Sequence, residues 1–206
     1  MGWFPFFMDV SAMDGLIVGG GAVALRKIEK LLDYGARLTV CAPSLLPEIE
    51  AVSGLVLLRE PFRPDLLDGK GFVIAATGDP ALNHEISALC QERGIPVNVV
   101  DDRAACSFLF PALVKRGDLS IGISTGGASP TAAVYWKEQI AELLPENTAG
   151  LLAYLDSLRE RVKESVPQEK ARAAVFDSLF RACMEEGWPL DETVLSALLA
   201  GAEGTP

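Results

Sequence analysis

A glycine-rich turn near the start of the chain constrains the fold more than any other feature. Residues 16–27 read LIVGGGAVALRK, so an apolar run ends in three glycines and continues into a helical pattern. Gly19, Gly21 and Ala24 fit the G-x-G-x-x-G/A pattern of dinucleotide-binding βαβ units, in which the glycines allow a tight turn and a close approach of the backbone to a pyrophosphate. That pyrophosphate would lie on the free N–H groups of the helix N-terminus. The pattern predicts a dinucleotide-binding strand–turn–helix unit; the alternative is a glycine-rich turn that binds no nucleotide.

The following stretch alternates strands with helices. Asp79 and Pro80 are typical of the cap and the first position of a helix, and Ser44 is expected to cap a short helix that ends near Val52. The run from Phe72 to Ala76 is almost entirely apolar, as in a strand that is covered on both faces. Strands are expected at 16–18, 37–42, 55–58, 72–76 and 95–100, and helices at 22–34, 44–52 and 80–94. This alternation predicts a Rossmann-type doubly wound parallel α/β sheet over residues 1–112.

The pattern changes after residue 112. Two strand-like runs, 108–115 and 119–124, are joined by Arg116-Gly117-Asp118, which indicates a hairpin. A second glycine-containing loop and a helix to about Leu144 follow. A hairpin with one helix cannot bury its own apolar face, so residues 113–146 are expected to be a small α+β dimerisation segment that packs on a second copy. Residues 147–206 carry helical apolar stripes and are expected to form a C-terminal helical domain.

Composition excludes several classes of partner. The formal net charge of −10 argues against nucleic acid, because neutralising phosphates requires clustered Lys and Arg. Four scattered cysteines without metal-binding spacing indicate free thiols in a reducing compartment. The apolar N-terminal segment is short and lacks a basic leader, and no run approaches the length of a membrane helix. We therefore expect a cytoplasmic protein with no membrane partner.

Several stretches, in order, resemble one known family. They are 16–27 (LIVGGGAVALRK), 35–40 (GARLTV), 75–77 (AAT), 97–101 (VNVVD) with Ser107, Phe108 and Pro111, and 124–130 (STGGASP). Together they resemble the precorrin-2 dehydrogenase / sirohydrochlorin ferrochelatase family, which includes the N-terminal region of siroheme synthase. The match spans residues 4–145, and the later helices fit the family less closely. The methyltransferase module that is fused to some members is expected to be absent from a chain of this length.

The resemblance implies a function in siroheme (porphyrin-type tetrapyrrole) biosynthesis. It implies oxidation of precorrin-2 to sirohydrochlorin with NAD as cofactor, in some members followed by insertion of Fe²⁺ as a chelatase substrate. It also implies a homodimer that pairs through the central hairpin and helix. An NAD-binding regulatory or sensor module without catalysis is the alternative function, against which the second glycine loop counts.

Asp101 is the candidate catalytic residue. It follows the fifth expected strand, at the carboxyl edge where open α/β sheets bind ligands. The resemblance gives this aspartate a role in dehydrogenation and, in bifunctional members, in chelation. Both reactions release protons from the macrocycle, and a carboxylate can accept them. Asp102 is the competing candidate. The alternative interpretation is that both aspartates are solvated acids in a turn without a catalytic role.

The candidate cofactor site combines the glycine turn with the ends of two other strands. An acidic residue that would bind the ribose is missing after the second strand, where Cys41, Ala42 and Pro43 stand, and no arginine stands there for a 2′-phosphate. The sequence pattern alone therefore leaves NAD and NADP open, and the resemblance favours NAD. The candidate cofactor-binding residues are Gly19, Gly20, Gly21, Ala22, Val23, Pro43, Ser44 and Thr77.

Substrate-binding residues are expected in the second glycine loop, whose hydroxyls and amides could hold substrate carboxylates. A structural turn that leads into a helix capped by Ser129 is the alternative. The candidates are Ser124, Thr125, Gly126, Ser129 and Arg103, with Lys115 and Arg116 as further cations. His84, the sole histidine, is expected to be structural, and Cys106 a small core residue. No metal site is predicted.

Overall fold

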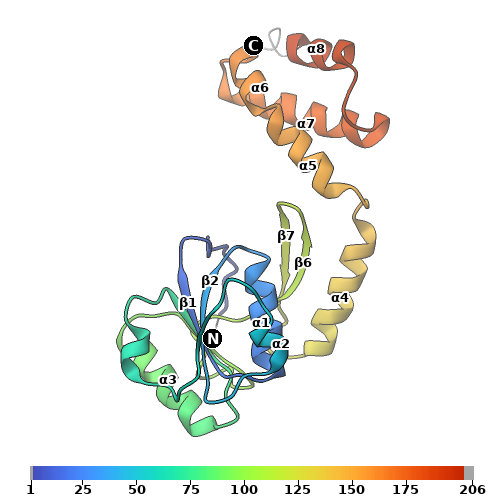
Figure 1. The fold of residues 1–206 in the computed structure, drawn as a ribbon. Coiled ribbons are helices and arrows are strands. Elements are labelled where there is room, and N and C mark those ends of the chain that lie inside the picture. The colour runs from blue at the N-terminus through green and yellow to red at the C-terminus, as the bar shows by residue number, and fades with distance from the viewer. Residues whose placement is uncertain (1, 202–206) are drawn as a thin grey trace. The chain divides into compact units, whose positions relative to one another are not determined.

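The computed structural model describes residues 2–201 and divides into two compact units. The first unit runs to Phe110 and includes Gly126–Ala128, and the second comprises Pro111–Thr125 and the chain from Ser129 onward (Figure 1). The division into three parts at residues 112 and 146 stays a prediction.

A five-stranded parallel sheet forms the centre of the first unit. Its strands are β1 (Asp14–Val18), β2 (Arg37–Cys41), β3 (Val56–Leu58), β4 (Phe72–Ala75) and β5 (Val97–Val99), in the spatial order β3-β2-β1-β4-β5. The connecting helices are α1 (Ala22–Leu32), α2 (Pro47–Glu50), the 3₁₀ helix η1 (Pro64–Leu67) and α3 (Pro80–Glu92). The chain leaves β1 toward one edge and returns to β4 to build the other, so the strand order reverses between β1 and β4. The predicted doubly wound parallel α/β fold is confirmed, and its ligand-binding crevice is expected at that reversal.

Alternate residues of β1 enter the two cores that sandwich the sheet. Leu16 packs in one cluster with Ile86 of α3, and Ile17 packs in the other with Ile28 of α1. All four side chains are completely buried. The helices α1 and α3 therefore cover opposite faces, which explains why a strand that is buried on both sides reads as a continuous apolar run.

Two local predictions had different outcomes. Asp79 caps α3 as predicted, because its carboxylate accepts hydrogen bonds from the N–H groups of Ala81 (2.9 Å) and Leu82 (3.4 Å). The prediction that Ser44 caps a helix is wrong: α2 begins at Pro47 with Leu46 as its N-cap. The reason is tertiary, since the backbone of this segment packs against the glycine turn.

The second unit begins with the predicted hairpin, β6 (Ala112–Arg116) and β7 (Leu119–Ile123), which are antiparallel. Helix α4 (Pro130–Leu143) packs on it and is capped by Ser129, whose hydroxyl accepts from the N–H of Ala132 at 3.1 Å. The remaining helices are α5 (Thr148–Ser157), α6 (Arg159–Ser165), α7 (Glu169–Glu186) and α8 (Glu192–Gly201). They share a third apolar core. None of the helices within residues 2–201 is long and apolar enough to span a membrane.

Candidate active site

The glycine turn is held by close backbone contacts at the carboxyl edge of the sheet. Gly19 is buried with φ +133°, its N–H donates to the carbonyl of Cys41 at 2.9 Å, and a Cβ on it would lie 2.3 Å from the carbonyl oxygen of Ala76. A Cβ on Gly20 would lie 2.1 Å from the carbonyl oxygen of Ser44. The turn after β1 therefore fits between the segments that follow β2 and β4, and both positions require glycine.

Gly19→Ala should destabilise the protein, because the new methyl group overlaps the Ala76 carbonyl and the backbone conformation is strained for alanine. We expect the free energy of unfolding to fall by roughly 3 kcal/mol, from strain and steric overlap that typically cost about 1–3 kcal/mol each. Denaturant unfolding followed by circular dichroism measures this change. Gly21→Ala is the control, since nothing lies within 4 Å of a Cβ there; equal unfolding midpoints for both variants would contradict the geometry.

The start of α1 is open to an anion. Gly21 is the N-cap residue, and no side chain caps the helix. The N–H groups of the first helical turn therefore have no side-chain acceptor, which is the arrangement that binds a pyrophosphate. Ala22, which is exposed, and Val23 follow directly. The five candidates from Gly19 to Val23 thus fit a dinucleotide phosphate group.

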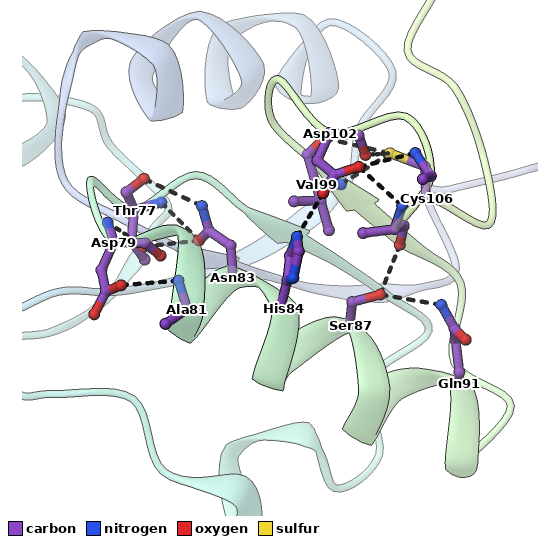
Figure 2. Close-up of polar contacts among 12 residues, drawn as sticks. Thr77, Asp79, Ala81, Asn83, His84, Ser87, Gln91, Val99, Asp102 and Cys106 are labelled. Atoms are coloured by element: carbon purple, nitrogen blue, oxygen red, sulfur yellow. Dashed lines mark hydrogen bonds and ion pairs between the residues drawn. The ribbon is translucent and has the colours of Figure 1, made fainter.

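Thr77 lies in the loop after β4, against which Gly19 packs. Its hydroxyl donates to Asn83 Oδ1 at 2.7 Å, and Asn83 Nδ2 donates back to the Thr77 carbonyl at 3.2 Å (Figure 2). Asn83 projects from α3 and is buried. The Thr77 hydroxyl is therefore used to fix its own loop, and Asn83 is a positioning residue that the sequence analysis missed; a polar residue on the inner face of α3 was the available signal.

The segment after β2 completes this edge. Pro43 and Ser44 are exposed there, and the backbone of Ser44 lies against Gly20. Cys41, where a ribose-binding acid would stand in the usual pattern, is buried, and its thiol donates to the carbonyl of Glu60 at 3.2 Å. Binding of a cofactor ribose by Ser44 or by backbone groups here stays a prediction.

Residues 101–108 form a loop that folds back onto the free edge of β5. The N–H of Ser107 donates to the Val97 carbonyl at 2.8 Å, and the N–H of Val97 donates to the Ser107 hydroxyl at 2.7 Å. Asn98, which is buried, donates through Nδ2 to the carbonyl of Phe108 at 3.0 Å. These bonds fix the turn that carries the two aspartates, and β5 is shorter than the predicted strand at 95–100. Asn98 belongs to the quoted VNVVD segment, but the sequence alone gave it no role.

Cys106 anchors the same loop from inside the core. Its sulfur accepts from the N–H of Val99 at 3.1 Å, and burial raises the pKa of the Cys106 thiol. The carbonyl of Ala105 next to it accepts from the Ser87 hydroxyl at 2.6 Å (Figure 2). Cys106 is therefore a buried, protonated core residue, as the sequence analysis expected.

The two adjacent aspartates lie in different environments. Asp102 is fully engaged: one carboxylate oxygen lies 2.5 Å from His84 Nε2, and the other accepts from the N–H of Ala104 at 2.9 Å (Figure 2). The hydrogen bond with His84 holds the pKa of Asp102 below its usual value. Asp102 and His84 thus link the loop to α3.

Asp101 is free by comparison. Within residues 2–201, no hydrogen bond or ion pair engages its carboxylate, and the residue is exposed. Its φ of +61° makes it the one non-glycine residue of the described chain in the left-handed region. Such strained conformations cluster at functional sites, and aspartate tolerates this one better than most residues. Of the two acids, Asp101 is the one whose carboxylate has no partner among the described residues.

The candidate substrate residues are divided between the units. Arg103 and Gly126 belong to the first unit, where the Arg103 side chain packs against the neighbouring Gly127: a Cβ there would lie 2.9 Å from Arg103 Cδ. Ser124, Thr125 and Ser129 belong to the second. The Thr125 hydroxyl donates to the Ser129 carbonyl at 3.0 Å and accepts from its N–H at 3.1 Å. These bonds serve the turn into α4, and a role in substrate binding stays a prediction. In the described part of the chain, no group of three or more His, Cys, Asp and Glu side chains could hold a metal ion.

The doubly wound sheet, the glycine turn at its switch point and the uncapped helix start define a dinucleotide-binding α/β protein. A family described as putative NAD(P)-binding matches residues 6–112, and one described as sirohaem biosynthesis protein central matches residues 116–143. The chain belongs to the precorrin-2 dehydrogenase / sirohydrochlorin ferrochelatase family, as its motifs predicted. Its first unit contains an NAD(P)-binding domain, which agrees with NAD as the cofactor.

Individual relatives agree with this assignment. The chain is 37% identical over 189 residues to a siroheme synthase of Thioalkalivibrio sulfidiphilus, which covers 90% of this chain and 39% of the relative. It is 40% identical over 210 residues to one of Ectopseudomonas mendocina, covering 98% and 45%. The chain thus spans less than half the length of these relatives. The solved structure of SirC, a precorrin-2 dehydrogenase, is similar with a TM-score of 0.69 at 25% identity, covering 98% of this chain and 100% of SirC.

Proposed function

We propose that this protein oxidises precorrin-2 to sirohydrochlorin with NAD⁺ as the acceptor. The observation that carries the proposal is the unpaired Asp101 carboxylate, which follows β5 at the same sheet edge as the uncapped start of α1. The likeness to SirC over nearly the full length of both chains supports the substrate. The central family match at residues 116–143 favours this enzyme over an NAD-binding sensor, which needs no such segment.

The reaction removes two electrons and two protons from the macrocycle. NAD⁺, when bound, supplies the hydride acceptor, so one hydride leaves with the nicotinamide and one proton must be taken up elsewhere. The backbone of Gly19–Val23 would hold the pyrophosphate, and the loop of Thr77 would bound the same crevice. Asp101 would accept the proton, because its carboxylate has no internal partner to displace.

The test of this function is an anaerobic assay with precorrin-2 and either NAD⁺, NADP⁺ or no cofactor. We expect the absorbance of sirohydrochlorin to grow with NAD⁺ faster than in a protein-free control. No acceleration with either cofactor would contradict the proposal, and preference for NADP⁺ would correct the cofactor.

We propose a second step because the similar proteins are siroheme synthases. This step is the insertion of Fe²⁺ into sirohydrochlorin. This step releases two pyrrole protons, and the same free carboxylate of Asp101 is suited to accept them. Sirohydrochlorin supplied anaerobically with Fe²⁺ or Co²⁺ tests it separately from oxidation. A rate no faster than the protein-free control would leave a dehydrogenase alone.

We propose further that the protein forms a homodimer through the hairpin β6–β7 and α4. Several large apolar side chains of α4 are exposed in the single chain: Val134, Tyr135, Trp136 and Leu143, with exposed fractions of 46–81%. Several large apolar side chains exposed on one helix are typical of a protein interface. A cytoplasmic location stays a prediction.

Trp136→Glu should convert the dimer to a monomer, because it places a charge among the exposed apolar side chains of α4. Light scattering coupled to size-exclusion chromatography measures the mass directly. Phe180→Glu is the matched control, since Phe180 is also an exposed aromatic residue (44%) but lies on α7. A monomeric wild type, or a Trp136→Glu variant that remains dimeric, would contradict this interface.

A further inference from the structure

The Arg26-Lys27 end of the first motif has no function in the account above. Lys27 lies in the second turn of α1 and is half-buried. Its Nζ stands 3.9 Å from the centroid of the Phe110 ring, close enough for a cation–π interaction. Phe110 is itself partly buried against the core under α1. The aromatic ring therefore fixes the position of this ammonium group.

Lys27 lacks a bonded anion. Among residues 2–201, no carboxylate lies within 4 Å of its Nζ, whereas Lys30 on the same helix pairs with Asp33 at 3.9 Å. Burial lowers the pKa of Lys27 and neighbouring Arg26 adds to the effect, while Cys106 and then Asp101 act in the opposite direction. The aromatic ring is thus the only partner of this half-buried ammonium group among residues 2–201, which leaves its charge available to an anion that binds from outside the chain.

The position of Lys27 distinguishes two candidate anions. The N–H groups of the first helical turn are suited to the cofactor pyrophosphate, whereas Lys27 lies six residues after the N-cap Gly21, about 9 Å farther along the helix axis. Phe110, whose ring lies under the Lys27 ammonium group, closely follows in sequence the loop 101–108, which carries the candidate proton acceptor Asp101. This contact favours a ligand on the side of the loop that carries Asp101 over the cofactor pyrophosphate.

We propose that Lys27 binds a side-chain carboxylate of the tetrapyrrole substrate and thereby holds the macrocycle beside Asp101. This inference rests on the proposed function, in which the substrate is a polycarboxylate. It also accounts for how an acidic chain attracts an anionic ligand: one cation, fixed by Phe110, is placed where the substrate binds.

Lys27→Met tests the proposal, because methionine keeps the packing on Phe110 and removes the charge. We expect KM for precorrin-2 to rise about 10-fold or more, the effect of losing one charge-assisted hydrogen bond. The dissociation constant of sirohydrochlorin, measured by absorbance titration without NAD⁺, should rise equally. KM for NAD⁺ should stay within about twofold of the wild-type value, because the proposal gives Lys27 no contact with the cofactor pyrophosphate. Lys27→Arg should recover most of the affinity, and Lys30→Met, a charge loss elsewhere on α1, should behave as wild type.

The possible results separate this inference from the function on which it rests. A wild type that neither oxidises precorrin-2 nor binds sirohydrochlorin overturns the proposed function and this inference with it. An active wild type whose Lys27→Met variant binds sirohydrochlorin normally overturns the inference alone. A rise confined to KM for NAD⁺ would mean that Lys27 binds the cofactor. A fall in kcat with unchanged tetrapyrrole affinity would mean that Lys27 acts on Asp101 in the chemical step. Either result overturns the proposal. Melting curves of the variants establish that they are folded.

Discussion

Asp101→Asn should lower kcat for precorrin-2 oxidation by about 10²–10⁴-fold, the usual contribution of a general base. Asparagine keeps the size of the side chain and tolerates the φ of +61° at this position, whereas alanine would add backbone strain. The dissociation constant of NAD⁺ should be unchanged, because the glycine turn is untouched. Steady-state kinetics and a fluorescence titration of the cofactor measure the two quantities.

Asp102→Asn is the matched control for that variant. It changes the same functional group one residue away, but it weakens the contact with His84 that links the loop to α3. We expect near-normal turnover from a folded protein. Full activity in Asp101→Asn would contradict the role of Asp101 as the general base. A large loss of activity in Asp102→Asn instead would assign that role to Asp102.

Gly21→Asp should greatly weaken NAD⁺ binding without lowering the stability of the fold. The new carboxylate would stand at the start of α1, where nothing lies within 4 Å of a Cβ, and aspartate is a favourable N-cap residue. It would repel the cofactor pyrophosphate, and like charges in contact cost several kcal/mol, so the dissociation constant of NAD⁺ should rise about 100-fold or more. Cofactor titration and thermal unfolding together measure affinity and stability.

Gly21→Asn separates charge from size in this experiment. Asparagine has nearly the same volume and also caps helices well, but it carries no charge. Its effect on NAD⁺ affinity should be clearly smaller than that of aspartate. If both variants bound NAD⁺ like the wild type, the pyrophosphate would not lie at the start of α1.

The sequence predicted the features that depend on local chemistry. The glycine turn and the Asp79 and Ser129 caps could be identified because each is set by a few neighbouring residues. The doubly wound sheet followed from the alternation of apolar runs with helical patterns. Ser44 was mistaken for a cap because a contact with Gly20, distant in sequence, decides the path of its backbone.

The candidate site was predicted less completely, because tertiary contacts decide which of its residues are paired and which stay free. Asp101 and Asp102 are chemically identical neighbours, and the fold distinguishes them by pairing Asp102 with His84 and leaving Asp101 free. Asn83 and Asn98 were missed since a buried amide gains its role from the backbone that folds onto it. Lys27 was missed for a similar reason, as Phe110 lies far from it in sequence.

In the proposed reaction, a cofactor bound at the glycine turn takes up hydride from a tetrapyrrole, and Asp101 accepts the proton. The most direct measurement is the stoichiometry of the anaerobic reaction of the wild-type protein with precorrin-2 and NAD⁺. We predict that NADH and sirohydrochlorin appear together in equal amounts, and that Asp101→Asn, with NAD⁺ bound, forms neither at a comparable rate. Sirohydrochlorin that forms without NADH, or no product above the protein-free control, would contradict the account.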